Sequence, residues 1–183
     1  MHHAVCRIQA QHEKSEQNGG NGVGFFDFMK GKKGAFLGAP VKGTCIPIQE
    51  VADPTFAEEI IGKGIAIKPS DGRVYAPADG TVSSIFPTGH AVGITTTDGV
   101  EVLIHVGLDT VELKGRHFQA VAEAGQKVKK GDFLLEADLE QISRAGYDTV
   151  VPVVICNSDE VSNLSCKTEG DVETGEEVIT YTK

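Results

Sequence analysis

TTTDGVEVLIHVGLDTVELKG, residues 95–115, is the stretch that decides the predicted fold of this chain. Two short apolar segments flank Asp98-Gly99, and such a pair is a strong β-hairpin signal because both central residues of a type I′ turn need positive φ. A two-residue loop at this point places His105 opposite Val92. His90 then becomes a diagonal neighbour of His105 on the same face, with Cβ atoms about 7 Å apart. A three-residue loop would place the two histidines on opposite faces.

Composition and length favour one globular domain of β-structure. The chain has 183 residues, of which 40% are hydrophobic, so it can bury one sizeable core. It has 22 glycines and no tryptophan, and its Val, Ile and Thr runs are separated by turn residues. We therefore predict an all-β fold, an antiparallel β-sandwich or barrel-like structure with a few short helices.

The expected elements are short and closely spaced. A short helix should begin at Pro54, after an Asp53 N-cap, and end at Gly62. Asp138 and Gln141 form a capping-box pattern that predicts a second helical turn. We expect strands at 65–67, 74–76, 81–86, 90–96, 100–106, 120–122, 133–137, 150–155 and 178–182.

Charge and cysteine usage exclude several classes of protein. The formal net charge of -9 argues against a nucleic-acid partner, since phosphates require a basic surface. The four cysteines show no CxxC spacing, so we interpret them as reduced thiols of a cytosolic protein. No apolar run approaches the ~20 residues of a spanning helix, and the N-terminus lacks the apolar core of a signal peptide. The expected location is cytoplasmic.

The N-terminal region differs in composition from the rest. Residues 1–22 are polar and glycine-rich, which predicts a disordered tail. Residues 23–43 are predicted to hold a short amphipathic segment and a linker, before a folded domain at 44–183. The amphipathic segment is a candidate anchor to an anionic membrane surface, with apolar and basic side chains from Phe25, Phe26, Phe28, Met29, Lys30, Lys32 and Lys33. Alternatively, its phenylalanines cover an apolar spot on the domain.

Several phrases occur in an order and spacing that together resemble one family. They are GKGIAIKP from Gly62, YAPADGTV from Tyr75, TGHA from Thr88, LIHVGLDTVELKG from Leu103, AEAGQKVKKGD from Ala122 and VPVVICN from Val151. Over roughly three quarters of its length the chain resembles the glucose-type enzyme IIA domain of the bacterial phosphoenolpyruvate:sugar phosphotransferase system. That family has an antiparallel β-sandwich fold. Its members take a phosphoryl group from the protein HPr on a histidine and pass it to the IIB domain of a sugar permease.

The resemblance implies roles for particular residues of this chain. The phosphorylated histidine falls on His105, its partner histidine on His90, and the hydroxyl that orients the partner on Thr88. The implied partner-docking residues are Asp53, Phe86, Gly107, Asp109 and Val111. Implied partners are HPr and the IIB domain of a glucose-family permease, together with possible regulated transporters or enzymes. The Phe-rich segment also resembles the N-terminal membrane anchor of some single-domain members, which would make the protein peripheral at the inner face of the membrane.

This chemistry suits two converging imidazoles. A neutral imidazole nitrogen is a nucleophile near neutral pH, and phosphoryl transfer needs mainly positioning and charge stabilisation from the protein. No cofactor is required, although His90 and His105 could bind zinc weakly.

Two alternative functions stay open at this point. A zinc hydrolase could use the same histidines, although it would need a third ligand and a general base. A module that senses phosphorylation without transferring it would use the same site.

Overall fold

The computed structural model describes residues 34–183, and residues 1–33 lie outside the described part. By internal contacts the chain divides at the same point, into a unit Met1–Lys33 and a unit Gly34–Lys183. The predicted disordered tail and the candidate membrane anchor from Phe25 to Lys33 therefore lie outside the described residues.

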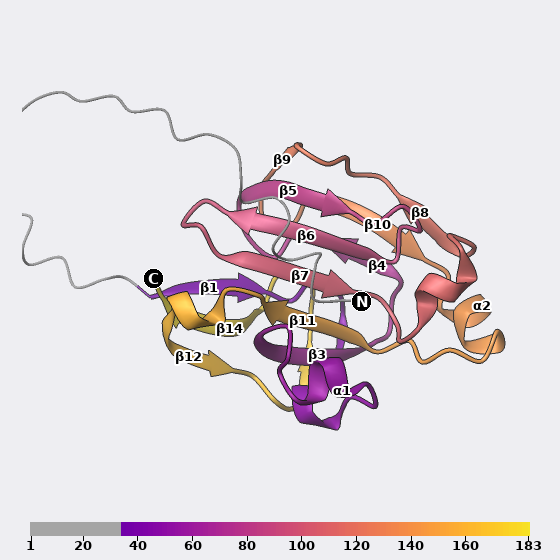
Figure 1. Cartoon of the computed structure of the whole chain (residues 1–183), viewed down its shortest axis with the longest axis horizontal. Coiled ribbons are helices and arrows are strands. Elements are labelled where there is room, and N and C mark those ends of the chain that lie inside the picture. Colours follow the sequence, from indigo (N-terminus) through magenta and orange to yellow (C-terminus); the bar gives the residue numbers. More distant parts are fainter. Residues whose placement is uncertain (1–33) are drawn as a thin grey trace, which may run out of the picture. The chain divides into compact units, whose positions relative to one another are not determined.

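Three antiparallel sheets make up the folded unit (Figure 1). The largest has eight strands, in the order β13 (Asp171–Val172), β2 (Gly43–Pro47), β3 (Lys63–Pro69), β11 (Val151–Ile155), β7 (Glu101–His105), β6 (Ala91–Thr96), β5 (Gly80–Ile85) and β9 (Lys127–Val128). Two smaller sheets have the orders β1 (Ala35–Gly38), β14 (Glu177–Thr182), β12 (Ser162–Cys166), and β4 (Arg73–Tyr75), β10 (Phe133–Ala137), β8 (Phe118–Ala120). The predicted all-β antiparallel fold is confirmed.

The main core forms where the inward faces of these sheets meet. In β7 burial alternates along the strand, and Val102 and Ile104 point inward. They join buried residues of the smaller sheets, including Leu37 of β1 and Leu135 of β10, in one apolar cluster. Alternation of this kind leaves the other face of β7, with His105, directed away from the main core.

A second, smaller apolar cluster covers the opposite face of the large sheet. It consists of Ile48, Val51, Phe56, Ala66, Leu108, Val150 and Val154. The short segments that supply it are the 3-10 helix η2 (Ile48–Glu50) and the helix α1 (Pro54–Ala57), which lies beside β3 in Figure 1. The same face carries His105, so this second cluster supports the region of the predicted site.

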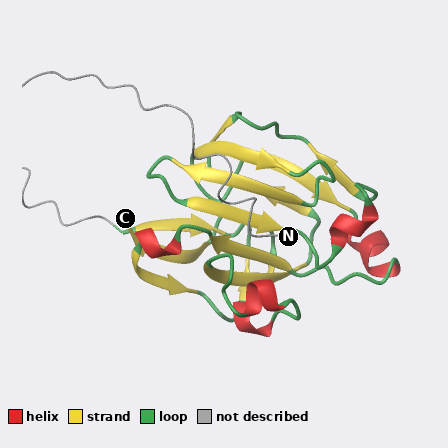
Figure 2. Ribbon diagram, viewed as in Figure 1, coloured by secondary structure: helices red, strands yellow, loops and turns green. Residues whose placement is uncertain are grey.

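Helices are few and short (Figure 2). Helix α1 begins as predicted, with the Asp53 side chain accepting a hydrogen bond from Thr55 N at 2.8 Å. It ends at Ala57 and not near Gly62, because Glu59 adopts a left-handed φ of 54° that a helix cannot contain. Helix α2 (Leu139–Arg144) is capped by Asp138, as predicted. The 3-10 helices η3 (Thr110–Leu113) and η4 (Ser158–Glu160) were not predicted.

The N-terminal boundary of the fold differs from the prediction. We expected residues 34–43 to be linker, yet Ala35–Gly38 form β1 and pair with β14. Leu37 is fully buried in the main core, which explains why this Gly- and Pro-flanked segment is ordered. The folded unit thus begins at Gly34 and not at residue 44. Strands β2, β9, β12 and β13 were also missed.

The β6–β7 hairpin has a different register from the one predicted. His105 pairs with Ala91, one residue away from the predicted partner Val92. The ladder continues to Thr95 opposite Glu101, and residues 97–99 form a three-residue loop. The predicted two-residue loop at Asp98-Gly99 is therefore wrong.

Side chains within the turn explain the longer loop. The Thr96 hydroxyl accepts a hydrogen bond from Val100 N at 2.9 Å and donates to Asp98 Oδ1. Gly99 N donates to Thr96 O, and Gly99 has the positive φ of 83° that a three-residue hairpin loop requires at its last position. Thr96 thus supplies local hydrogen bonds that a two-residue loop would lack.

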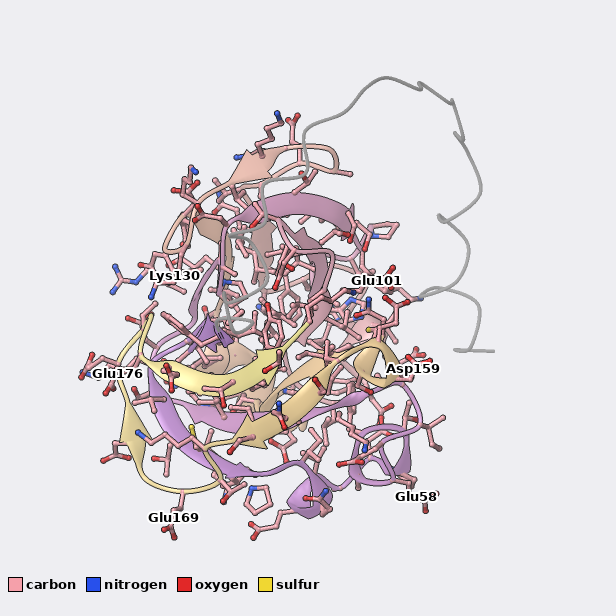
Figure 3. All side chains as sticks on the ribbon, turned by 90° about the vertical axis from the view of Figure 1, so that its left-hand side faces the viewer. Glu58, Glu101, Lys130, Asp159, Glu169 and Glu176 are labelled. Carbon is pink, nitrogen blue, oxygen red and sulfur yellow. The ribbon has the colours of Figure 1, made fainter. Side chains whose placement is uncertain are left out.

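Charged side chains lie on the outside of this unit. Figure 3 shows Glu58, Glu169 and Glu176 pointing away from the ribbon, and all three are exposed. Across residues 34–183 there is no helix that is long and apolar enough to cross a membrane.

Candidate functional site

His90 and His105 meet at one end of the β6–β7 hairpin. Their ring centroids are 4.8 Å apart, and the rings are close to perpendicular with an interplanar angle of 76°. His90 is buried with 3% of its surface exposed, while His105 is partly exposed. The predicted convergence of the two histidines is therefore confirmed.

The predicted reason for this convergence is wrong. Because His105 pairs with Ala91, regular alternation would place His90 on the other face. His90 precedes the first residue of β6, however, and follows a turn in which Gly89 has a positive φ of 67°. The backbone stays attached to the hairpin through Val106 N, which donates to His90 O at 2.8 Å. Strand parity does not apply beyond the regular ladder, so the ring can lie against His105.

Thr88 fixes one nitrogen of His90. The Thr88 hydroxyl oxygen lies 2.5 Å from His90 Nδ1. Thr88 and His90 belong to the tight turn between β5 and β6, in which Gly89 N donates to Phe86 O at 2.7 Å. The contact predicted between the hydroxyl and the partner histidine is thus present.

Gly107 fixes one nitrogen of His105. The two atoms His105 Nδ1 and Gly107 O are 2.8 Å apart. Because a carbonyl oxygen only accepts hydrogen bonds, Nδ1 carries the proton in this contact. In the neutral imidazole the lone pair then resides on Nε2, which is the nitrogen suited to nucleophilic attack.

Aromatic side chains surround the two imidazoles. Phe56 of α1 packs edge-to-face on His105 with centroids 5.3 Å apart, and Phe86 packs similarly on His90 at 5.3 Å. Phe118 of β8 contacts His90 at 6.4 Å. Sequence reasoning predicted Phe86 at the site but missed Phe56 and Phe118. Phe56 lies at the start of the helix predicted after Asp53. This position was the sequence feature that could have pointed to a role at the site.

The remaining predicted docking residues lie on short segments that adjoin these rings. Asp53 caps α1, the helix that carries Phe56. Asp109 is exposed, has a left-handed φ of 56° and begins η3. Val111 in η3 is an exposed apolar residue, as is Ile60 after α1.

The metal-binding capacity of the site rests on the two imidazoles. Within residues 34–183 there is no group of three or more His, Cys, Asp or Glu side chains placed to hold a metal ion. A closed structural zinc site has four protein ligands, and a catalytic one usually has three. The two histidines of the described site are fewer than either kind of zinc site has.

The thiols of Cys45 and Cys166 are poor competitors as nucleophiles. Burial raises the pKa of the Cys166 thiol to about 11, and burial also raises the pKa of Cys45. Since the thiolate is the reactive form, these groups stay protonated near neutral pH. The imidazole of His105 is therefore a better candidate for the nucleophile than either of these two thiols.

Comparison with known proteins agrees with this geometry. The family described as "phosphoenolpyruvate-dependent sugar phosphotransferase system, EIIA 1" matches residues 36–161. The chain belongs to this family. Among glucose-specific EIIA components, the protein of Halalkalibacterium halodurans is 45% identical over 138 residues, covering 75% of this chain and 80% of that protein. That of Buchnera aphidicola is 44% identical over 155 residues, covering 85% of this chain and 95% of that protein.

Longer relatives and a solved structure extend the comparison. A PTS system beta-glucoside-specific EIIBCA component of Dickeya chrysanthemi is 48% identical over 137 residues, covering 75% of this chain but only 22% of that protein. The chain thus spans less than a quarter of the length of the beta-glucoside-specific relatives it matches. The solved structure titled glucose permease IIA from Mycoplasma capricolum superposes with a TM-score of 0.75 at 36% identity, covering 81% of this chain and 96% of that one.

Proposed function

We propose that this EIIA domain is a phosphocarrier, which accepts a phosphoryl group from phospho-HPr on His105 and passes it to the IIB domain of a glucose-family sugar permease. The observation that carries the proposal is the 2.8 Å contact between His105 Nδ1 and Gly107 O. It holds the proton on Nδ1 and so presents the Nε2 lone pair as the nucleophile.

The transfer step uses few protein groups. The Nε2 lone pair of His105 forms a bond to phosphorus while the donor's bond to phosphorus breaks, and that electron pair returns to the donor. In the second transfer the acceptor forms a bond to phosphorus while the bond between phosphorus and Nε2 breaks, and that electron pair returns to Nε2. Such in-line exchange depends on positioning and on stabilising the equatorial oxygens. No cofactor enters either step.

His90 is assigned the role of hydrogen-bond donor. When the Thr88 hydroxyl donates to His90 Nδ1, the neutral ring carries its proton on Nε2. The Nε2–H group can then donate to an oxygen of the phosphoryl group on His105, whose ring lies 4.8 Å away between centroids. Thr88 supports this role by fixing the tautomer and the ring orientation.

The surface around the two histidines is assigned to protein partners. HPr and the IIB domain would each cover Phe86 and Val111 while their basic groups face Asp53 and Asp109. Gly107, whose lack of a side chain keeps the backbone close to His105, belongs to the same surface. Phosphoryl exchange then takes place with little access to water, which limits hydrolysis. Binding of regulated transporters or enzymes at this surface, and a cytoplasmic location with peripheral membrane attachment, complete the proposal.

The direct test is phosphoryl acceptance. The full chain is incubated with phosphoenolpyruvate, enzyme I and HPr, and its intact mass is measured before and after acid treatment. The expected result is a gain of one acid-labile phosphate. An unchanged mass with active partner proteins would refute the carrier function, and hydrolytic activity stimulated by zinc would support the zinc-hydrolase alternative.

A further inference from the structure

Thr110 lies directly behind the loop that orients His105. It is the first residue of η3 and is completely buried, which is unusual for a polar residue. Its hydroxyl donates to Val106 O at 2.7 Å. A Cβ atom built on Gly107 would lie only 2.5 Å from Thr110 Cγ2, so the methyl group of Thr110 packs against the backbone of Gly107.

The same loop is held from its other side by residues that follow α2. Gly107 N donates to Val150 O at 2.9 Å, and Leu108 N donates to Asp148 O at 3.0 Å. The Asp148 side chain in turn accepts from Val150 N at 2.8 Å, which closes a local turn. The Val106–Gly107 peptide is therefore held by Thr110 and Val150, and the next peptide, which bears Gly107 O, is held by the bond from Leu108 N to Asp148 O.

Gly107 itself cannot hold this position unaided. Its φ of 77° lies in the left-handed region, where glycine has access to many other conformations in the absence of restraint. The direction of its carbonyl, and with it the hydrogen bond from His105 Nδ1, depends on neighbours on either side. Thr110 contacts this backbone directly, because its hydroxyl donates to Val106 O and its methyl group packs against Gly107.

We infer that Thr110 is a positioning residue, whose buried hydroxyl aligns the Val106–Gly107 backbone so that Gly107 O holds the proton on Nδ1 of His105. The inference rests on the proposed function for its kinetic consequence, although the tautomer of His105 can be measured without any transfer. Loss of the hydroxyl leaves the buried Val106 carbonyl without this donor, and relaxation of that carbonyl would turn the Gly107 peptide.

Two substitutions separate the hydroxyl from the methyl group. Thr110→Val keeps the shape and removes the hydroxyl, whereas Thr110→Ser keeps the hydroxyl and removes the methyl group. Tyr181→Phe is the control, since Tyr181 is also buried and its hydroxyl donates to Asp98 at the turn end of the same hairpin. It reports what loss of a buried hydroxyl far from His105 does to the hairpin.

The experiment measures the protonation of the two ring nitrogens of His105 by ¹⁵N NMR of histidine-labelled full chain, and the rate of phosphoryl acceptance from HPr. Thr110→Val should lower the ratio of the Nδ1–H to the Nε2–H tautomer, and the rate with it, by about threefold to tenfold, the effect of one hydrogen bond. Thr110→Ser and Tyr181→Phe should retain the wild-type ratio and rates within about twofold.

Three results would overturn the inference: a wild-type tautomer ratio in Thr110→Val, an equally altered ratio in Thr110→Ser, or the same alteration in Tyr181→Phe. If Thr110→Val does not fold, the Ser variant still decides, because a changed tautomer with the hydroxyl present contradicts the assigned role. Failure of the proposed function looks different, since the wild-type chain would then accept no phosphate while the tautomer ratios could still follow the expected order.

Discussion

The β6–β7 hairpin uses its polar side chains differently at its two ends. At the turn end, hydrogen bonds from other segments of the fold hold the hairpin turn in place. The Tyr181 hydroxyl donates to Asp98 Oδ2 at 3.0 Å, and Lys183 Nζ and Asn157 Nδ2 each donate to Gly99 O at 3.0 Å. These contacts join the hairpin turn to β14 and to the segment before η4.

At the histidine end, a protein contact holds the Nδ1 atom of each imidazole ring. Thr88 contacts Nδ1 of His90, and Gly107 O accepts from Nδ1 of His105. The proposed function assigns the chemistry of both rings to Nε2. Contacts at the turn end should therefore affect mainly the free energy of unfolding, while those at the histidine end should affect mainly the rate of transfer. Substitutions at the two ends test this division.

The largest expected effect is at His105. His105→Ala removes the attacking nitrogen, so the variant should accept no phosphate from HPr, as measured by intact mass. The fold should persist, because His105 is partly exposed and lies outside the main core. Recovery of phosphate on His90 or His117 in this variant would overturn the assignment of the nucleophile.

A smaller kinetic effect is expected at His90. His90→Gln removes the assigned donor to the phosphoryl group, and loss of one such donor costs about 3 kcal/mol, on the order of 100-fold in rate. Acceptance from HPr should survive, because the donor protein brings its own stabilising groups, whereas onward transfer should slow. Quenched-flow measurement of both half-reactions separates them. Equal slowing of the two would contradict a role specific to onward transfer.

At the turn end the effect should be on stability alone. Tyr181→Phe removes the hydrogen bond to Asp98, which should lower the free energy of unfolding by about 1.5 kcal/mol, measured by urea denaturation, and leave both transfer rates unchanged. A transfer defect in this variant would show that the two ends of the hairpin are coupled.

The same tyrosine gives a pH test. Burial, followed by the hydrogen bond to Asp98 and the charge of that residue, raises the pKa of Tyr181 in the folded state. The folded chain therefore retains this proton to higher pH than the unfolded chain, whose tyrosines titrate near pH 10. The contribution of Tyr181 is fully present below about pH 10 and is lost as the pH rises above it. The stability difference between wild type and Tyr181→Phe should shrink over that range.

The smallest expected effect is zinc binding at the histidine end. Two imidazoles leave a tetrahedral shell incomplete, so calorimetry on the full chain should find only weak binding that disappears in His90→Gln. Nanomolar affinity in the wild-type chain would mean that further ligands join the two histidines, and would revive the zinc-enzyme alternative.

The sequence predicted that His90 and His105 converge, but not the geometry that brings them together. The convergence of His90 and His105 was expected, but from a two-residue loop that the structure replaces with three residues. Asp-Gly favours a two-residue loop by backbone propensity alone. The Thr96 hydroxyl outweighs that propensity through hydrogen bonds to Val100 and Asp98, which form only once the longer loop exists.

Contacts between distant segments account for the other misses. β1 is flanked by Gly and Pro and has little strand signal, yet its pairing with β14 and the burial of Leu37 order it. Phe118 reaches His90 across the fold, which no local pattern shows. Asp53, in contrast, was recognised as an N-cap because capping depends on residues adjacent in sequence.

The second apolar cluster also restricts how this surface can evolve. Phe56 is part of that cluster and in ring contact with His105, so any replacement there must satisfy folding and catalysis together. Ile60 and Val111 are exposed and carry no such double constraint. Under the proposed function, partner preference can therefore drift by substitutions at these outer positions, while Phe56, beside the proposed nucleophile, changes only with compensating changes in residues of the same cluster such as Val51 or Leu108. Chains that diverge to serve different permeases should differ first at the outer positions.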